Sequence, residues 1–332
     1  MAAPLHNQPP PTDDTPVVTV LITNYNGREI LRDALGAVYQ TGTGVPFDVV
    51  VIDDASTDES AAMVRREFPA VRLIVNESNM GFVRANNRGV REARGRYIFL
   101  LNSDTIVVND AIAILSGYLD SHPEAGACGG WLLGRDGSAQ VSFGSFPSLP
   151  QAIVDALFLN DLFPRAGFPR RAMVPGEADT APRRVDYISG ADLMVRRSLV
   201  ERLGLFDEQF VAYCEEVDLC HRILHIAGLE TVFVPAARII HLVGASYGKR
   251  VERQVRTQYT SYHLFLTKHY GVFLSLVTRL LYAWHFGAKL LARWLFFLAA
   301  SPRAKEGHRE QMLRAWYAVR YSLFPSSQSA VR

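Results

Sequence analysis

The chain has 332 residues, of which 48% are hydrophobic, and it contains three irregularly spaced cysteines. This length and composition exclude a globally disordered protein and leave room for one large domain with an appendage, and the cysteine spacing excludes a disulfide framework. The net charge of +2 hides an asymmetry: residues 249–332 hold 14 Lys or Arg against 3 Glu, which suggests that this end of the chain meets an anionic surface.

The first 16 residues are rich in proline and lack the charged start and apolar stretch of a secretory signal, so we expect a disordered tail there. Short β-branched runs then alternate with helical segments up to about residue 105. The predicted strands span residues 17–23, 47–53, 71–75 and 96–101. The predicted helices begin near Arg28, at residue 57 with a capping box formed by Ser56 and Glu59, and near Gly81. This alternation is typical of an α/β fold with a doubly wound, mostly parallel sheet.

All four strands end in polar loops, which read "TNYNG", "DDAS", "NESNMGF" and "NSDT". Ligands of doubly wound sheets bind beyond the carboxyl ends of the strands, so these loops predict a binding site. Asp104, at the end of the fourth strand, suits a divalent cation that also touches phosphate oxygens, or it simply caps the next helix. Asp53 and Asp54 are able to accept hydrogen bonds from a base or a ribose, and a capping role is the alternative.

The stretch "NMGFVRANNRG" is more specific. Gly81 permits close approach of a ligand to the backbone, and Arg84 and Asn87 lie within one helical turn of each other. One cation among neutral hydrogen-bonding groups suits a nucleotide diphosphate at a helix start.

Residues 126–185 show no clear period apart from the strand-like "ACGGWLL". Order returns in a strand from residue 187, a second strand at 231–235 and the segment 239–246 that closes the body. Between them "YCEEVDLCHR" begins a helix with Glu215, Glu216 and Asp218 in its first turn. Acidic residues at this position favour the helix dipole, and Asp218 has the spacing for a pair with Arg222. These structural reasons leave Glu216 unexplained.

The basic end of the chain predicts an amphipathic helix over about 272–300 and a second one over about 306–323. The polar side chains of the first helix fall within about one third of its circumference; they are Ser275, Thr278, Arg279, His285, Lys289 and Arg293. No charge-free run reaches the ~18 residues of a membrane span. We therefore expect a helix lying in a membrane surface, with Trp284 and Trp294 at its boundary. A helix packed on the body is the alternative, and an apolar, Trp-bearing helix argues against nucleic acid as the partner.

Seven segments in order resemble the family 2 glycosyltransferases, which are inverting nucleotide-sugar enzymes of the GT-A fold. The matching segments are "VTVLITNYNG", "VVVIDDASTD", "NMGFVRANNRG", "YIFLLNSDT", "SGADLMVRR", "LGLFDEQFVAYCEEVDLCHR" and "FVPAARIIHLVGAS". They run from residue 17 to about 246, which we take as the glycosyltransferase domain, followed by the helical region 247–332. Within the family the pattern, including "LTKHYG" at 266–271, looks most like bacterial rhamnosyltransferases acting on lipid-linked acceptors.

The resemblance implies roles for the donor-side residues. Asn24, Asp53 and Asp54 would hold the base and ribose, and Asp104 would bind Mg²⁺ or Mn²⁺ on the diphosphate. Asn102 stands where the family's Asp-X-Asp element has its first acid, so we assign it to nucleotide-sugar binding and not to the metal.

The resemblance also implies the remaining site residues. His241 matches a histidine that completes the metal shell in relatives, and a histidine satisfied inside the core strand is the alternative. The family pattern Glu-Asp-X-Asp assigns the general base to Glu216, with Glu215 as the second candidate and Asp218 beside them in the acidic set.

Together these features predict a metal-dependent inverting glycosyltransferase at the cytoplasmic face of a bacterial plasma membrane. It would transfer a sugar, such as rhamnose from dTDP-rhamnose, to a lipid-linked or envelope-glycan acceptor. A non-catalytic nucleotide-sugar-binding or scaffold subunit is the alternative, and binding without turnover would distinguish it. A dinucleotide-dependent dehydrogenase is disfavoured because "TNYNG" replaces the G-x-G-x-x-G turn after the first strand.

Overall fold

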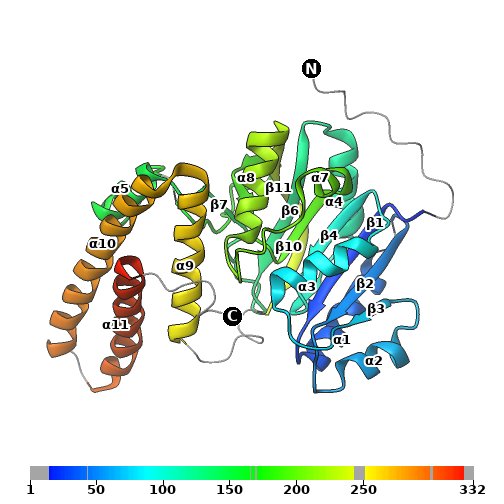
Figure 1. Ribbon diagram of the computed structural model, residues 1–332, viewed down its shortest axis with the longest axis horizontal. Helices are drawn as coiled ribbons and strands as arrows, with labels where there is room; N and C mark the ends of the chain where they lie inside the picture. Colours follow the sequence, from blue (N-terminus) through cyan, green and yellow to red (C-terminus); the bar gives the residue numbers. More distant parts are fainter. Residues whose placement is uncertain are drawn as a thin grey trace.

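The body of the molecule is built on one large mixed sheet. The computed structural model describes residues 15–42, 44–164, 166–168, 170–242, 251–299 and 302–324, so the predicted disordered tail lies almost wholly outside the described residues. The strands are β1 (Val18–Asn24), β2 (Phe47–Asp53), β3 (Arg72–Val75), β4 (Tyr97–Leu101), β5 (Thr105–Val107), β6 (Ala125–Leu133), β8 (Arg183–Val185), β10 (Asp192–Arg196) and β11 (Glu230–His241). They follow the order β3-β2-β1-β4-β10-β6-β11-β5, with β8 paired to β11 (Figure 1).

The first four strands are parallel neighbours, as their β-branched runs and intervening helices predict. β10 enters antiparallel between β4 and β6, and β11 runs parallel to β6 but antiparallel to β5. The doubly wound, mostly parallel sheet predicted from the sequence is therefore confirmed. Because β1 to β4 are parallel, the polar loops that follow them lie along one edge of the sheet.

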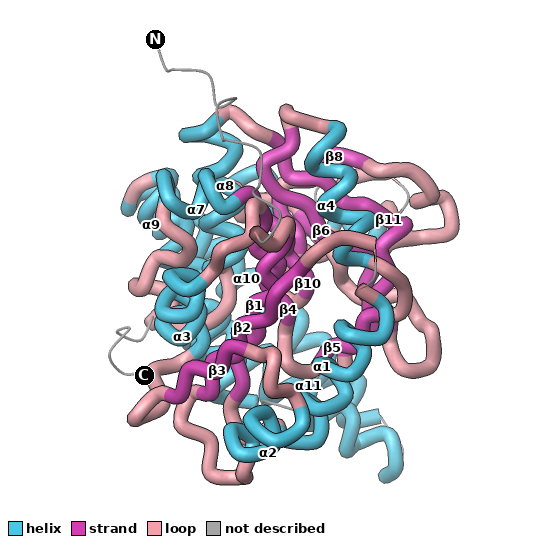
Figure 2. Tube along the Cα trace, turned by 90° about the vertical axis from the view of Figure 1, so that its right-hand side faces the viewer, coloured by secondary structure: helices cyan, strands magenta, loops and turns pink. Residues whose placement is uncertain are grey.

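Helices bury both faces of this sheet. One face packs against α1 (Arg28–Thr41), α2 (Ser60–Glu67) and α4 (Ala111–Ser121). The other face packs against α3 (Phe82–Gly89), α7 (Arg197–Leu203) and α8 (Glu215–Ala227). Figure 2 shows α1 and α4 on one side of the strands and α3, α7 and α8 on the other. The two hydrophobic cores fix the strand ends, and with them the loops that carry polar side chains.

The capping box predicted at residue 57 is wrong. Helix α2 begins at Ser60, and Glu59 at its N-cap has φ 66° with no side-chain capping bond. The hydroxyl of Ser56 instead accepts the backbone N–H of Asn26 at 2.9 Å, which ties the loop after β2 to the loop after β1. The carboxylate of Asp58 accepts the backbone N–H of Ser60 at 3.1 Å, so an acid two residues before the helix replaces the predicted cap.

Three helices follow the body at the C-terminal end: α9 (Val251–Tyr270), α10 (Val272–Ala299) and α11 (Pro302–Leu323). Two short helices from the irregular middle of the chain, α5 (Leu149–Ala156) and α6 (Leu159–Leu162), lie beside α10, and Figure 1 shows this group set apart from the sheet. Helix α9, which the sequence analysis did not predict, contributes Phe265 to the core around α8. The two-stranded sheet of β7 (Phe143–Gly144) and β9 (Tyr187–Ile188) connects this region with the body. The boundary predicted at 246–247 lies outside the described residues.

Helix α10 turns its polar stripe toward the protein. Ser275, Thr278 and His285 are buried, and the Arg279 guanidinium donates to the carbonyls of the last residues of α11 at 2.7 and 2.8 Å. Lys289 pairs with a carboxylate of α6 at 3.4 Å. Arg279 and Lys289 therefore have partners within the protein, and the placement of this helix in a membrane surface stays a prediction.

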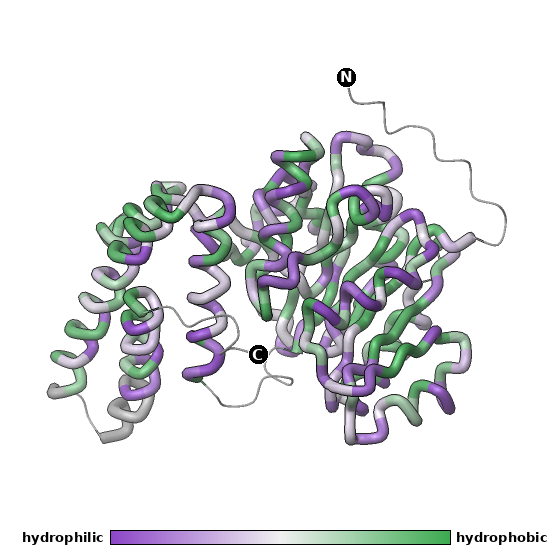
Figure 3. Tube along the Cα trace, in the orientation of Figure 1, coloured by the Kyte–Doolittle hydropathy of each residue, from purple (hydrophilic) through white to green (hydrophobic). Residues whose placement is uncertain are grey.

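The opposite side of α10 is apolar and exposed. Its exposed residues are Val272, Phe273, Leu276, Leu280, Trp284, Leu291, Trp294, Leu295 and Phe296, and we call this set the apolar face of α10. Figure 3 shows hydrophobic residues recurring along the length of this helix. None of the helices in the described ranges has the length and apolarity needed to cross a bilayer.

Candidate active site

Two buried polar side chains face each other where β1 and β2 end. Asn24 and Asp53 are cross-strand partners, and the Asn24 amide donates to the Asp53 carboxylate at 3.3 Å. The second Asp53 oxygen accepts the backbone N–H of Ser56 at 2.9 Å. The Oδ1 atom of the Asn24 side chain is buried and has no hydrogen-bond partner in the described part of the chain. A ligand donor reaching this strand end would satisfy it.

Asp54, the next residue, anchors the loop that follows β3. Its carboxylate accepts the backbone N–H groups of Met80 and Gly81 at 2.8 and 2.9 Å and the Asn76 amide at 2.6 Å. Gly81 has φ 83° and ψ 159°, a conformation that is essentially restricted to glycine. The structure therefore gives Asp54 and Gly81 a clear local role, which is to shape the loop 76–81 at the sheet edge.

Arg84 and Asn87 of α3 contact the loop that follows α7. The Asn87 amide donates to the carbonyl of Phe206 at 2.9 Å and accepts its N–H at 3.0 Å. Arg84 pairs with Glu208 at 3.2 Å. Both side chains thus hold α3 to the loop 205–208, and their role in nucleotide-sugar binding stays a prediction.

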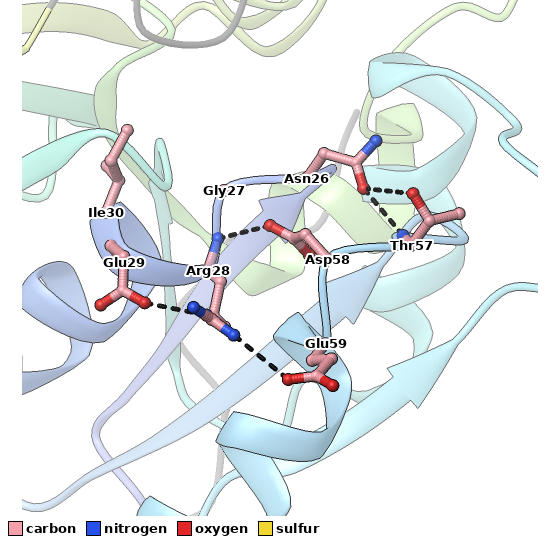
Figure 4. A pocket seen from close by; sticks show the side chains of 8 residues that line it. All are labelled: Asn26, Gly27, Arg28, Glu29, Ile30, Thr57, Asp58 and Glu59. Carbon is pink, nitrogen blue, oxygen red and sulfur yellow. Dashed lines mark hydrogen bonds and ion pairs between the residues drawn. The ribbon is translucent and has the colours of Figure 1, made fainter.

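Open space lies directly beyond β1 and β2. A hollow of about 600 Å³ is lined by Asn26, Gly27, Arg28, Glu29, Ile30, Thr57, Asp58 and Glu59. Figure 4 shows Arg28 bridging two carboxylates and the Asn26 side chain accepting from Thr57. The lining begins two residues after Asn24 and four residues after Asp53, but it contains none of the predicted donor-binding residues. Its polar groups largely satisfy one another.

Asp104 and His241 converge beyond the carboxyl end of β4, at the same sheet edge as the loops after β1 and β2. Asp104 directly precedes β5, His241 ends β11, and these two strands pair antiparallel at Thr105 and His241. This register brings the His241 Nε2 atom to 3.3 Å from the Asp104 carboxylate, which is 9% exposed. A carboxylate and an imidazole at this spacing fit two positions of a Mg²⁺ or Mn²⁺ shell that substrate oxygens and water would complete. No group of three or more metal-binding side chains occurs among the described residues.

Asn102 connects this pair to the acidic helix. Its backbone N–H donates to the carbonyl of Ala191 at 3.1 Å, and its own carbonyl accepts the Thr105 hydroxyl at 2.7 Å. The residue before Ala191 is Gly190, and the Glu216 side chain lies against it: a Cβ at Gly190 would sit 3.5 to 3.8 Å from Cβ, Cγ and Cδ of Glu216. The loop 189–191 therefore touches the Asn102–Asp104 turn on one side and the Glu216 carboxylate on the other.

The first turn of α8 is held in an unusual backbone conformation. Tyr213 and Cys214 both have positive φ, 65° and 66°, immediately before Glu215. Non-glycine residues in this region cost roughly 1–2 kcal/mol each, so the surrounding structure must enforce the turn. Such strain is characteristic of positions where a chain directs functional side chains.

Glu215 and Glu216 occupy environments that oppose ionisation. Burial raises the pKa of Glu216 to about 7, and its buried Oε2 atom has no hydrogen-bond partner in the described residues. Glu215 is more deeply buried, 6% exposed, and burial together with the Glu216 charge raises its pKa well above the usual range. Glu216 is half-buried and therefore the more accessible of the two. A carboxylate with a pKa near neutrality is suited to accept a proton.

Asp218 has a different character from its two neighbours. Its oxygens pair with Arg222 at 2.8 Å, Lys268 at 2.7 Å and His269 at 2.8 Å. Although burial opposes ionisation, the His269 hydrogen bond and the nearby cations hold the Asp218 pKa well below its usual range. The pair predicted with Arg222 is present, and the two further partners, Lys268 and His269, come from α9. Asp218 is thus a structural link between α8 and α9 and is poorly suited to accept a proton.

Two residues near this site were missed by the sequence analysis. Asp192, on β10, is fully buried, and its Oδ2 atom accepts the N–H of Gly130 at 2.6 Å. Burial raises its pKa well above the usual range. Arg171 lies in the irregular segment 126–185 and places its guanidinium 4.9 Å from the Tyr262 ring. The alternating pattern of "ADLMVRR" could have indicated a buried acid at 192, but no period marks Arg171.

Comparisons with known proteins concern the family and the fold of the chain. The family model described as "Glycosyl transferase family 2" matches residues 19–204. The chain is 30% identical over 276 residues to an N-acetylglucosaminyl-diphospho-decaprenol L-rhamnosyltransferase of Mycobacterium tuberculosis, a match covering 78% of this chain and 86% of that protein. It is 31% identical over 172 residues to rhamnosyltransferase WbbL of Escherichia coli, covering 48% of this chain and 60% of that one.

Solved structures show the same fold. The mannosyltransferase PcManGT from Pyrobaculum calidifontis, in complex with GDP-Man and Mn²⁺, matches with a TM-score of 0.55 at 17% identity, covering 94% of this chain and 88% of that one. GalNAc-T7, with UDP, GalNAc and Mn²⁺, matches with a TM-score of 0.53 at 16% identity, covering 77% and 51%. At these identities the likeness concerns the fold alone, and it agrees with the predicted GT-A architecture.

Proposed function

The chain belongs to glycosyl transferase family 2 and is a glycosyltransferase, and from this premise we propose that it catalyses an inverting, metal-dependent sugar transfer. The proposed donor is dTDP-rhamnose, and the proposed acceptor is a sugar linked through a diphosphate to a lipid of the cell envelope. The rhamnosyltransferase relatives support the sugar. The name of the mycobacterial relative, which specifies a diphospho-decaprenol acceptor, supports the acceptor class.

The observation that carries the proposal is the environment of Glu216. Its pKa of about 7 keeps a fraction of the carboxylate ionised at neutral pH while leaving it basic enough to take a proton. In the proposed reaction the acceptor hydroxyl gives its proton to Glu216 as its oxygen bonds to the anomeric carbon. The bond from that carbon to the diphosphate breaks on the opposite face, and the nucleotide diphosphate leaves with the electron pair.

The donor would lie along the ends of β1, β2 and β4. We assign the base and ribose to Asn24 and Asp53, whose side chains meet at the sheet edge. Asp54 and Gly81 would act by shaping the adjacent loop, and Asn102 by joining the donor loop to the loop beneath Glu216.

Asp104 and His241 are the residues that would hold Mg²⁺ or Mn²⁺. When bound, the ion would neutralise the charge that develops on the departing diphosphate. The fit rests on the 3.3 Å approach of an imidazole nitrogen to a carboxylate at the paired ends of β5 and β11. Both structural neighbours were solved with Mn²⁺, which supports the choice of a divalent ion for this chain.

We further propose that the helical region binds the inner surface of a bacterial plasma membrane. The apolar face of α10 is exposed, whereas Ser275, Thr278 and His285 on its polar side are buried and the helix contacts α5, α9 and α11. A helix on a water-facing surface normally buries its apolar side and exposes its polar side. Residues 249–332 carry a large excess of Lys and Arg, which complements anionic lipid headgroups. An anionic bilayer is therefore the occupant that we assign to this face.

The decisive experiment measures rhamnose transfer from dTDP-rhamnose to a lipid-linked N-acetylglucosaminyl diphosphate. We expect turnover by the wild-type protein and a loss of about 10²–10⁴-fold in kcat for Glu216→Gln. Glu201→Gln, which alters an exposed glutamate on α7, is the matched control and should leave turnover unchanged. Full turnover by Glu216→Gln would remove the base assignment. Binding of the donor without turnover on any acceptor would favour a non-catalytic subunit instead.

A further inference from the structure

An arginine without an anionic partner lies between the proposed base and the apolar helices. Arg171 is half-buried, and its guanidinium packs over Tyr262 of α9 at 4.9 Å from the ring centroid. In the described ranges of the chain no carboxylate forms an ion pair with it. Other arginines of the same segment are paired, Arg183 with Asp179 at 3.2 Å and Arg184 with Glu230 at 3.0 Å. A cation withdrawn from water is normally compensated by an anion, so this one calls for a ligand.

The surroundings of Arg171 are rich in hydrogen-bonding groups from three elements. Tyr262 and Tyr282 are buried and joined by their hydroxyls at 2.9 Å, and Tyr259 lies one helical turn before Tyr262 on α9. The imidazole of His263 is 5% exposed, and neither of its nitrogens has a partner among the described residues. Burial and the charges of Arg279 and Arg171 lower the His263 pKa to about 3, so the ring is neutral and free to donate one N–H.

This cluster adjoins the acidic turn of α8. Cys214 packs against the hydrophobic group that contains Tyr262 and Tyr282, and it stands two residues before Glu216. The hydroxyl of Tyr187 donates to the backbone carbonyl of Arg171. Burial raises the Tyr187 pKa, the Glu216 charge raises it further, and Arg171 opposes both effects. Arg171 and Glu216 are therefore close enough to act on the same side chain.

The same cluster adjoins the apolar surface on its other side. Ala152 of α5 packs against Tyr262 and Tyr282, and the Tyr282 hydroxyl donates to Asp155 at 3.2 Å. Trp284, two residues further along α10, donates to the last carbonyl of α5 at 3.2 Å while its ring stays exposed. Exposed Ile153 of α5 and Leu157, directly after this helix, continue the apolar face of α10. Glu216, Arg171 and the apolar face of α10 thus follow one another in space. A lipid-linked glycan has its parts in the same order: sugar, charged diphosphate and lipid.

We propose that Arg171, with the tyrosines and His263 around it, binds the anionic diphosphate that joins the acceptor sugar to its lipid. This inference rests on the proposed function, since it specifies how the acceptor is held. The sugar hydroxyl then faces Glu216, and the lipid chain runs along α5 and α10 toward the bilayer. Arg171 is a binding residue for the acceptor and takes no part in donor recognition.

The test compares a charged and an uncharged acceptor. Steady-state KM values are measured for a short-chain lipid-linked N-acetylglucosaminyl diphosphate and for an uncharged alkyl glycoside of the same sugar. We expect Arg171→Met to raise the KM for the diphosphate acceptor about 10- to 100-fold, as loss of a charge-assisted contact predicts, with unchanged KM for the alkyl glycoside and for the donor. Arg171→Lys should be intermediate. Arg170→Met removes an exposed neighbour that bonds only Asn160 and a loop carbonyl, and it should change nothing.

An equal rise in KM for both acceptors, or no rise for either, would overturn the proposal. A second measurement separates this site from the transfer activity. Inorganic pyrophosphate in excess chelator should raise the melting temperature of the wild-type protein and of Arg170→Met but not of Arg171→Met. If the wild-type protein uses neither acceptor, the proposed function fails. The pyrophosphate shift then decides the anion site on its own, and equal shifts in all three proteins would rule it out.

Discussion

The Glu216 carboxylate should destabilise the fold at the pH where it works as a base. Burial raises its pKa from 4.5 to about 7, a difference that corresponds to roughly 3 kcal/mol of free energy of unfolding as an upper bound. Below pH 4.5 the group is protonated in both the folded and unfolded states, so it has no effect. Between 4.5 and about 7 the folded state retains a proton that the unfolded state has lost, so stability falls as pH rises. Above about 7 the full penalty persists.

Glu216→Gln removes this penalty because glutamine is neutral at every pH. We expect the variant to be more stable than the wild-type protein by up to roughly 3 kcal/mol at about pH 8.5 and nearly equal to it at about pH 5. Relief of the repulsion on Glu215 acts in the same direction. Urea unfolding at the two pH values measures the difference. Glu201→Gln changes an exposed glutamate and should shift stability by no more than about 0.5 kcal/mol at either pH.

The same group should set the pH dependence of turnover. A base must be ionised, so kcat/KM of the wild-type protein should rise with a midpoint near pH 7. Glu215→Gln distinguishes the roles of the two glutamates. This variant should also stabilise the protein at high pH, but it should keep substantial turnover because Glu216 remains. The reasoning is refuted if Glu216→Gln is no more stable than the wild-type protein at about pH 8.5, or if the rise in activity is centred near pH 4.5.

Other perturbations give distinct results. Asp218→Asn removes the buried carboxylate that Arg222, Lys268 and His269 share, although Lys268 keeps its pair with Asp207, and it should cost about 3–5 kcal/mol of unfolding free energy in urea. Because the Asp218 pKa is depressed, this contribution is present above about pH 4 and is lost as pH falls. Asp104→Asn should raise the Mn²⁺ concentration needed for half-maximal transfer at least about 10-fold, measured in a metal titration after chelation. An unchanged half-maximal concentration would exclude Asp104 as a ligand. Gly81→Ala forces a side chain into φ 83° and should cost about 1–3 kcal/mol by thermal unfolding, although open space surrounds the site. Replacing Leu280 and Trp284 by Glu should abolish cosedimentation with anionic vesicles but preserve folding, and retained binding would exclude the apolar face of α10.

The strand ends could be predicted from the sequence because they depend on local signals. β-branched runs predicted four strands, which the structure shows to be parallel neighbours. Parallel neighbours have their carboxyl ends at one edge of the sheet. The same signals do not say what a polar side chain at that edge contacts. Asp54 and Asn87 were both predicted to bind the nucleotide sugar, which stays a prediction. The sequence did not reveal that Asp54 also binds the backbone at Met80 and Gly81, or that Asn87 binds Phe206, 119 residues away. Such partners depend on loop conformations that have no period.

The amphipathic pattern of α10 was visible in the sequence, but its orientation was not. A period of 3.6 residues identifies which side chains share a face and leaves open which face meets the protein. In most helices the apolar side is buried. Here Ser275 and Thr278 are buried because each finds a carbonyl acceptor, on α9 and on α10 itself, and Arg279 satisfies the carbonyls that end α11. Satisfied polar groups remove the penalty of burial, and the apolar side is then available for a membrane.

The contacts of α9 make the acidic turn and the apolar helices parts of one structural unit. Lys268 and His269 of α9 hold Asp218, which stands one half-turn after Glu216 on α8. Ser261 of α9 donates to the carbonyl of Ala212, just before the two strained residues that precede the acidic pair. Any motion of α9 would therefore change the direction of the Glu216 carboxylate. In the proposed membrane-bound state, docking through α10 would hold the proposed base at a fixed position relative to the bilayer, as transfer to a sugar whose lipid remains in the membrane requires.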